Sequence, residues 1–442
     1  HIIGQFHGFD RYSWVVTAYL LTSTIMIPLS GKLSDQFGRK WFLLVGASIF
    51  LLGSVLTGAS QNMDQLIAFR ALQGFGAGIG MTLVAAIIGD IFPPQERAKW
   101  QASVNIVYAV SGLLGPVLGG WFTDYGPLLG SLVTATTRWR WIFYLNLPLG
   151  ILALATLLVF LPATLSERSS HLTGWDAVRR IDIIGALLCT VATICLLLGL
   201  TWGSNQTYAW NSIQVIGILV AAGIFALLFL LAEQRAVEPL LPLNLFRSQI
   251  VAADAALSLL VYMILLALAV YLPLFLQGVL HISPTNAGVM MTPFLLSITL
   301  GATLFGWLIA LRKRYHAIII VGTLIMTAGV ALLTQITPTT NLLALVLSMV
   351  LAGLGIGSIF SVLYLAIQNA LPPTQLGIGS ATIRYLGQIG STLGLAIVGS
   401  VVNQFEALKL PLATAIQYGL ITVLIFCAVA ALAALFLKDA KG

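Results

Sequence analysis

The sequence predicts an all-α protein that crosses a membrane many times. Of its 442 residues, 59% are hydrophobic and only 8% are charged, whereas soluble domains contain about 25% charged residues. Apolar runs long enough to cross a bilayer as helices follow one another along the chain. We expect thirteen such spans, at residues 13–31, 41–59, 65–89, 102–122, 141–161, 183–200, 213–232, 250–276, 288–311, 317–333, 342–370, 378–402 and 416–437.

The loops between these spans alternate in charge, and this alternation predicts their sides of the membrane. One set of loops contains fifteen of the 21 lysines and arginines, the other set contains four, and Arg70 and Arg384 lie within spans. Lys and Arg accumulate in cytoplasmic loops, so we expect the first set, and the C-terminus with it, to be cytoplasmic. The formal net charge of +7 reflects this topology, and nucleic-acid binding is not expected.

Residues that usually carry chemistry are few and scattered. The three cysteines fall inside apolar runs, and the five histidines lie at span ends or in loops. Neither group has the spacing of a metal site or of a disulfide framework. No nucleophile–base pair or phosphate-binding loop is visible, so we expect a protein that is not an enzyme and uses no metal or cofactor.

Glycines and prolines recur at a nearly constant separation, which predicts an internal repeat. Residues 92–95, Phe-Pro-Pro-Gln, are echoed at 371–374 by Leu-Pro-Pro-Thr. Four glycine pairs have this same separation and two more have a slightly shorter one: Gly74/Gly353, Gly76/Gly355, Gly78/Gly357, Gly115/Gly394, then Gly46/Gly322 and Gly53/Gly329. The two halves are therefore expected to be parallel repeats.

The repeat also predicts the domain organisation. The back half has six spans, but the front half has only five before a pair at 183–232 that has no mate. We expect an N-terminal bundle in 1–161, two extra spans with cytoplasmic linkers in 162–249, and a C-terminal bundle in 250–442. Symmetry requires one more span before residue 1. We therefore expect this chain to be a fragment of a fourteen-span protein that begins at span 2.

A charged loop is expected between the first two spans. Residues 31–40 read Gly-Lys-Leu-Ser-Asp-Gln-Phe-Gly-Arg-Lys, with a glycine at each end of the reversal. This pattern resembles the signature loop of the major facilitator superfamily, which implies a carrier made of two six-helix bundles. By the resemblance, Asp35 and Arg39 latch the cytoplasmic gate with Asp90 as a nearby partner; a simple topological anchor is the alternative. The other expected gate residues are Gly31, Gly38 and Lys40.

Arg70 lies inside the apolar run 65–89, about 8 Å below the membrane boundary at a rise of 1.5 Å per residue. An arginine at this depth is costly unless it faces water or a partner. One interpretation is that its long side chain reaches the outer surface. The other, by resemblance to the span 4 motif of the superfamily, is that it controls a proton-binding carboxylate. The repeat places Met349 at the matching position, which favours the functional interpretation.

Residues 111–120, Ser-Gly-Leu-Leu-Gly-Pro-Val-Leu-Gly-Gly, lie in the expected span 102–122. Small residues at this spacing let helices touch closely, and a proline bends a helix. A generic packing seam is one interpretation. The ordered Gly-Pro instead resembles the antiporter signature of exporters in the superfamily, which is thought to seal the outer leak path and which favours export over uptake. The residues that carry this resemblance are Gly112, Gly115, Pro116, Gly119 and Gly120.

Residues 138–148, Arg-Trp-Arg-Trp-Ile-Phe-Tyr-Leu-Asn-Leu-Pro, precede and enter the span 141–161. Trp and Arg at a membrane interface are a common anchor pattern. The string also resembles the fourteen-span drug/proton antiporter family, as does the segment 14–21. The unpaired spans at 183–232 agree with this resemblance, which covers the whole chain.

Antiport requires a group that binds and releases a proton. Asp254 is the only acid within an apolar run, about five residues into the span 250–276. In the resembling family the coupling acid commonly lies in span 1, and Asp254 lies in the repeat mate of that span. Asp124, next to the span 5 motif, is a second candidate. Either residue is alternatively a helix-end cap.

The expected function is the export of lipophilic small molecules or drugs in exchange for protons, by a monomer in the bilayer of the inner or plasma membrane. The runner-up is a dedicated exporter of one metabolite, siderophore or antibiotic, and a receptor or structural role is a rival from another class. The polar residues expected to line the substrate cavity are Gln73, Asn105, Tyr108, Arg384 and Gln388.

Overall fold

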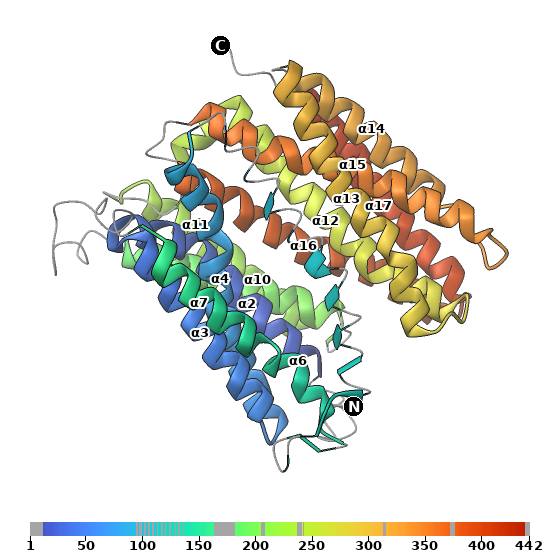
Figure 1. Cartoon of the computed structure of the whole chain (residues 1–442). Helices are drawn as coiled ribbons and strands as arrows, with labels where there is room; N and C mark the ends of the chain where they lie inside the picture. Colours follow the sequence, from blue (N-terminus) through green and yellow to red (C-terminus); the bar gives the residue numbers. More distant parts are fainter. Residues whose placement is uncertain are drawn as a thin grey trace. The chain divides into compact units, whose positions relative to one another are not determined.

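Figure 1 shows a computed structural model of the chain. The structure describes residues 12–93, 136–162, 182–204, 208–236, 241, 243–312, 315–371 and 376–437, together with scattered residues between 96 and 134. In these ranges, eleven helices are long and apolar enough to cross a membrane, and each matches an expected span. The all-α, membrane-spanning class is confirmed. Of the other two expected spans, 13–31 is helical with a shorter apolar part, Ala18–Gly31. The span 102–122 is described only in part, and its described residues are helical.

The chain forms two compact units, and the first comprises residues 1–91, 115–196 and 220–242. Its front elements are drawn in blue to green in Figure 1. They are α2 (Tyr12–Phe37), α3 (Arg39–Ala59), α4 (Met63–Ile91), the 3₁₀ helix η2 (Arg138–Arg140), α6 (Trp141–Tyr144) and α7 (Asn146–Phe160). Two further helices, α10 (Ile183–Ser204) and α11 (Ile213–Glu233), each divide between the two units.

The second unit comprises residues 92–114, 197–219 and 243–442. A continuous cluster of buried apolar side chains runs through it, from Ala253 of its first long helix to Ala434 of its last. The elements are η3 (Leu243–Arg247), α12 (Gln249–Gly278), α13 (Pro284–Arg312), α14 (His316–Leu333), α15 (Leu342–Ala370), α16 (Leu376–Ala407) and α17 (Leu412–Phe436).

The predicted internal repeat is visible in the packing of the recurring glycines. A Cβ atom added to Gly53 of α3 would lie 2.6 Å from the Cα atom of Gln73 of α4. One added to Gly329 of α14 would lie 2.8 Å from the Cα atom of Ala352 of α15. Both glycines therefore let two helix backbones approach directly, as small residues do in membrane bundles. Gln73 and Ala352 have the same separation in the chain as the two Pro-Pro pairs.

The expected loop at residues 31–40 is mostly helix. Helix α2 continues to Phe37 and α3 begins at Arg39, so the chain reverses at Gly38 alone. Gly38 has φ +88°, a conformation that glycine adopts without steric cost. Gly31 is buried inside α2, where its carbonyl accepts a hydrogen bond from Ser34 Oγ (2.9 Å). The expectation that both glycines make the reversal is therefore wrong, because α2 stays helical past Gly31.

Candidate functional site

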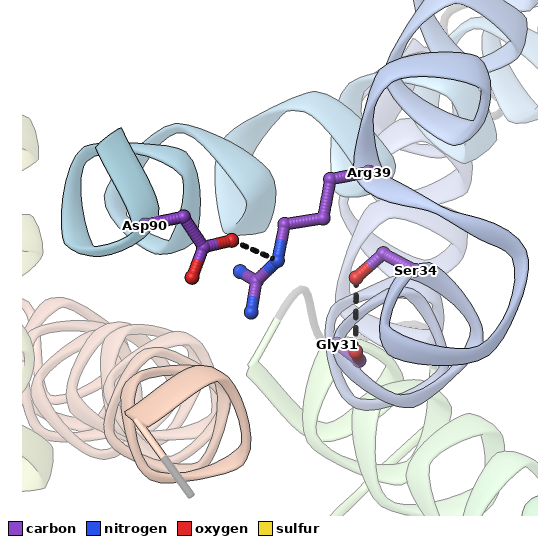
Figure 2. A network of polar contacts seen from close by, with 4 residues as sticks. All are labelled: Gly31, Ser34, Arg39 and Asp90. Atoms are coloured by element: carbon purple, nitrogen blue, oxygen red, sulfur yellow. Dashed lines mark hydrogen bonds and ion pairs between the residues drawn. The ribbon is translucent and has the colours of Figure 1, made fainter. Parts of the chain in front are cut away.

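An ion pair holds the α2–α3 turn against α4. Arg39 Nε lies 2.6 Å from Asp90 Oδ2, and the two side chains are only 14% and 15% exposed. Figure 2 shows them pointing toward one another, with Ser34 turned back to Gly31 within α2. The predicted pairing of Arg39 with Asp90 is confirmed. The side chain of Asp35 lies outside the described residues.

Lys40 binds the end of a second neighbouring helix. Its Nζ atom donates to the carbonyl oxygens of Leu158 (3.0 Å) and Leu161 (2.7 Å), at the C-terminus of α7. These carbonyls belong to the last turn, where helix carbonyls have no partner within the helix. The second unit repeats the arrangement, because Nδ1 of His316 hydrogen-bonds the carbonyl of Leu437 at the end of α17. The donors Lys40 and His316 are separated by as many residues as Gly53 and Gly329, and so are the acceptors Leu161 and Leu437. We call each of the two contacts, Lys40 with Leu161 and His316 with Leu437, a clasp.

Arg70 is held by neutral groups from two helices. Its Nε atom donates to the carbonyl of Val15 in α2 (3.1 Å), and Nη1 donates to Oε1 of Gln73 one turn along α4 (2.6 Å). The guanidinium carbon lies 4.2 Å from the centre of the Tyr19 ring, within the range of a cation–π contact. These contacts engage the guanidinium within the first unit, which favours the functional interpretation over a side chain that only reaches the outer surface. They also leave its charge without a carboxylate partner among the described residues.

A chain of hydrogen bonds extends from Gln73 across the bundle. Gln73 Nε2 donates to Ser54 Oγ of α3 (2.9 Å), and Asn146 Nδ2 of α7 donates to the same oxygen (2.8 Å). Ser54 in turn donates to the carbonyl of Phe143 (3.0 Å). Gln73 is only 2% exposed and both ends of its amide are engaged. The expectation that it lines the substrate cavity is therefore not supported, since its polar atoms are already bound.

The stretch 138–148 is more than an interfacial anchor. Trp139 is 1% exposed and packs edge-on against the ring of Phe143. Arg140 Nη2 donates to the carbonyl of Ser60, just after α3 (3.0 Å). The helix is interrupted at Leu145, between α6 and α7, and Asn146 follows immediately. The sequence predicted only an interfacial anchor and a family resemblance for this stretch. It did not predict that Asn146 and Ser54 belong to a buried polar network.

Asp254 lies in α12 with no exposed surface. Neither of its carboxyl oxygens has a hydrogen-bond partner among the described residues. The interpretation as a helix-end cap is therefore wrong, because a cap would accept a bond from a backbone N–H group. One turn further along, Ser258 Oγ donates to the carbonyl of Ile383 in α16 (2.8 Å), so this face of α12 packs against α16.

The span 5 motif is only partly described. A Cβ atom added to Gly112, Gly115 or Gly119 would meet no heavy atom of the described residues within 4 Å. The close helix contact expected at these glycines is therefore not found among the residues that the structure describes. The expected motif residues Pro116 and Gly120 lie outside the described residues.

Three other expected site residues, Asp124, Asn105 and Tyr108, also lie outside the described residues. Arg384 and Gln388 are half-buried, four residues apart on α16, so they share one face of that helix. Within the described ranges, no three His, Cys, Asp or Glu side chains are grouped so that they would hold a metal ion.

The sequence profile of the Major Facilitator Superfamily matches residues 1–245 and 255–442. The chain belongs to this superfamily. It is 34% identical over 401 residues to Multidrug resistance protein 3 of Bacillus subtilis (strain 168), covering 91% of this chain and 74% of that protein. It is 34% identical to the multidrug transporter protein MdtP of the same organism over 402 residues, 91% of this chain and 70% of that protein.

The chain is also similar to a fungal efflux pump and to two transporters of known structure. The efflux pump dotC of Dothistroma septosporum (strain NZE10 / CBS 128990) is 31% identical over 410 residues, 92% of this chain and 68% of that protein. The human organic anion transporter MFSD10 superposes with a TM-score of 0.64 at 17% identity, covering 95% of this chain and 83% of that one. The proton:xylose symporter XylE superposes with a TM-score of 0.64 at 14% sequence identity, covering 95% of this chain and 84% of that one. The major facilitator fold predicted from sequence is confirmed: this is a multi-pass membrane transporter and not an enzyme.

Proposed function

We propose that this transporter exports lipophilic small molecules from the cell in exchange for protons, by alternating access. The observation that carries the proposal is the similarity, over nine-tenths of the chain, to relatives named as multidrug transporters and an efflux pump. Its setting is the cell membrane, with the Arg39 end of the first unit on the cytoplasmic side, because the basic loops gather there.

Arg70 is proposed to set the charge of the proton-binding site. A guanidinium in an apolar span that has only neutral partners keeps its full electrostatic effect on any carboxyl group that approaches it. Such a charge favours the ionised carboxylate and therefore the release of its proton. Arg70 fits this role because its described partners are a backbone carbonyl, an amide oxygen and an aromatic ring.

Asp254 is the proposed proton carrier within this chain. An ionised carboxylate is costly to bury without hydrogen bonds or a counter-ion, so a carboxyl group in this environment is neutral. It ionises only when water or a substrate reaches it during the transport cycle, and the proton leaves at that moment. Complete burial and two unbonded oxygens support this role. Asp124 remains the second candidate from sequence.

The gates are assigned by the same proposal. Asp35 and the Arg39–Asp90 pair close the cytoplasmic side, and the Arg39–Asp90 contact of 2.6 Å supports this by fastening the α2–α3 turn to α4. The span 5 motif closes the outer side by its resemblance to the antiporter signature. The two bundles rock about a central site to expose it to each side in turn.

Ethidium accumulation in a pump-deficient bacterium that expresses the full-length gene tests the proposal. We expect low accumulation that rises when a protonophore collapses the proton gradient. Arg70→Ala and Asp254→Asn should each raise accumulation to the level of cells without the pump, with normal amounts of protein in the membrane. Arg235→Ala, at an exposed arginine after α11, should pump like the wild type.

The outcomes separate the candidate functions. Ethidium export that ignores the protonophore would refute proton coupling while leaving export intact. Accumulation equal to that of empty cells, with protein present in the membrane, would instead favour a dedicated exporter of one metabolite, siderophore or antibiotic. Wild-type export by both Arg70→Ala and Asp254→Asn would remove these two residues from the mechanism.

A further inference from the structure

Ser54 is the centre of the buried polar network in the first unit. Its side chain has no exposed surface, and its oxygen takes part in three hydrogen bonds of 2.8–3.0 Å. It donates one, to the carbonyl of Phe143, and accepts two, from Gln73 and Asn146. A serine hydroxyl has one proton to donate and two lone pairs. Ser54 therefore uses its whole hydrogen-bonding capacity, and it joins α3 to α4, α6 and α7.

The hydroxyl of Ser54 decides which way the amide of Gln73 faces. With Nε2 directed at Ser54, Oε1 is directed at Nη1 of Arg70, 2.6 Å away. The flipped amide would place N–H groups against the guanidinium, donor against donor. Its oxygen would then face a hydroxyl whose proton is committed to the carbonyl of Phe143. A flip would therefore break one buried and one partly buried hydrogen bond at once, and each polar group left unsatisfied in such a place is costly.

The second unit shows that the fold does not need a polar group at these places. In the internal repeat, Ser54 corresponds to Val330, at the separation of Gly53 and Gly329. Gln73 corresponds to Ala352 and Arg70 to Met349, both at the separation of Gly74 and Gly353. All three residues of the second unit are apolar and completely buried. Since one unit fills the same positions with hydrocarbon, the polar network of the other unit has a role other than holding the helices together.

We propose that Ser54 and Asn146 are positioning residues for Arg70, a role that rests on the proposed proton-coupled export. Asn146 lies directly after the interruption at Leu145 and donates to the Ser54 hydroxyl, and this hydroxyl holds the Gln73 amide. The amide oxygen in turn holds the guanidinium above the ring of Tyr19. Ser54 and Asn146 touch neither the proton nor the substrate. Their effect is to keep the positive charge in one place while the helices around it move.

Ser54→Ala in proteoliposomes tests this role with two transport assays. Ethidium transport driven by an imposed pH gradient should fall about tenfold, the effect expected when a buried hydrogen-bond partner is removed. Ethidium exchange without a gradient should keep its wild-type rate, because it needs no net proton movement. The matched control is Ser48→Ala on the same helix, whose hydroxyl donates only to the carbonyl of Leu44 (2.8 Å). It should change neither rate.

A double-mutant cycle of thermal stability provides a test that does not depend on transport. Ser54 and Arg70 do not touch but share Gln73, so Arg70→Ala should lower the midpoint of unfolding less in the Ser54→Ala background than in the wild type. Additive effects would overturn the proposal, as would an equal loss of both transport rates or no loss of either. If the wild type shows no response to the gradient, the proposed function fails, while the cycle still decides whether Ser54 positions Arg70.

Discussion

Gly76 of α4 is the position at which the helix packing of the first unit is most sharply testable. A Cβ atom there would lie 2.6 Å from the carbonyl oxygen of Gly46 and 2.8 Å from the Cα atom of Phe50, both in α3. Gly80, one turn further along α4, has no heavy atom of the described residues within 4 Å of the same added atom. Gly76→Ala and Gly80→Ala are therefore the same change on the same helix, the first against a backbone and the second with no described atom in contact.

The difference in stability between the two variants follows from these contacts. Replacing glycine by alanine inside a helix gains about 0.5–1 kcal/mol at either position, so this contribution cancels. At Gly76 the 2.6 Å contact must lengthen to the 3.4 Å of ordinary packing, and the backbone nitrogen of Phe50 would lie closer still, so α3 and α4 must move apart by at least about 0.8 Å. Because both contacted atoms belong to the backbone, no side-chain rotation relieves the strain, and overpacking of this kind costs about 1–3 kcal/mol.

The measurement is the thermal midpoint of unfolding of the two purified variants in the same detergent. We expect Gly80→Ala to be at least as stable as the wild type and Gly76→Ala to be less stable than Gly80→Ala by about 1–3 kcal/mol. Gly355→Ala, the repeat mate of Gly76, should behave like Gly76→Ala. Equal stability of Gly76→Ala and Gly80→Ala would refute the close approach of α3 and α4.

Two further predictions concern the ends of the helices. Arg39→Ala should lower the free energy of unfolding by about 1–3 kcal/mol, because it removes the guanidinium that pairs with the largely shielded carboxylate of Asp90. The exchange of both residues should restore part of the loss in the same detergent assay, and no restoration would argue against a direct pairing. Lys40→Leu should cost about 1 kcal/mol through loss of the bonds to the end of α7. Lys40→Gln keeps an N–H donor, so it should lower the free energy of chemical unfolding by less than Lys40→Leu does. Equal losses in the two variants would count against the clasp.

The repeat and the ion pair show what patterns in the sequence predict well. The regular separation of the glycines predicted two matching halves, and the structure places Gly53 and Gly329 at equivalent crossings. The charged motif predicted that Arg39 has Asp90 nearby. Both predictions depend on features that are rare in apolar helices, namely recurrent glycines and charges, so a chance match is improbable.

The boundaries of the turn and the polar network were not predictable in the same way. Nothing distinguishes Gly31 from Gly38 in sequence, since both flank charged residues, and only the backbone conformation shows which one turns. The sequence alone does not distinguish Ser54 from Ser48 and Ser60. All three lie at or near α3, but among the described residues only the side chain of Ser54 receives hydrogen bonds from other helices. Which serine meets a partner depends on helix rotation, which no local pattern encodes.

The two clasps have a consequence for how the halves of the protein have diverged. In each, the acceptor is the carbonyl of the residue that follows the last helical residue, Leu161 or Leu437. The donor is an ammonium group in Lys40 but an imidazole nitrogen in His316, and an imidazole N–H donates whether or not the ring is charged. The requirement is thus for an N–H group at a fixed place and not for a formal charge. A contact of that kind does not weaken as ionic strength rises, so any weakening by high salt should appear at the Arg39–Asp90 pair, reduced by the burial of that pair, and not at His316.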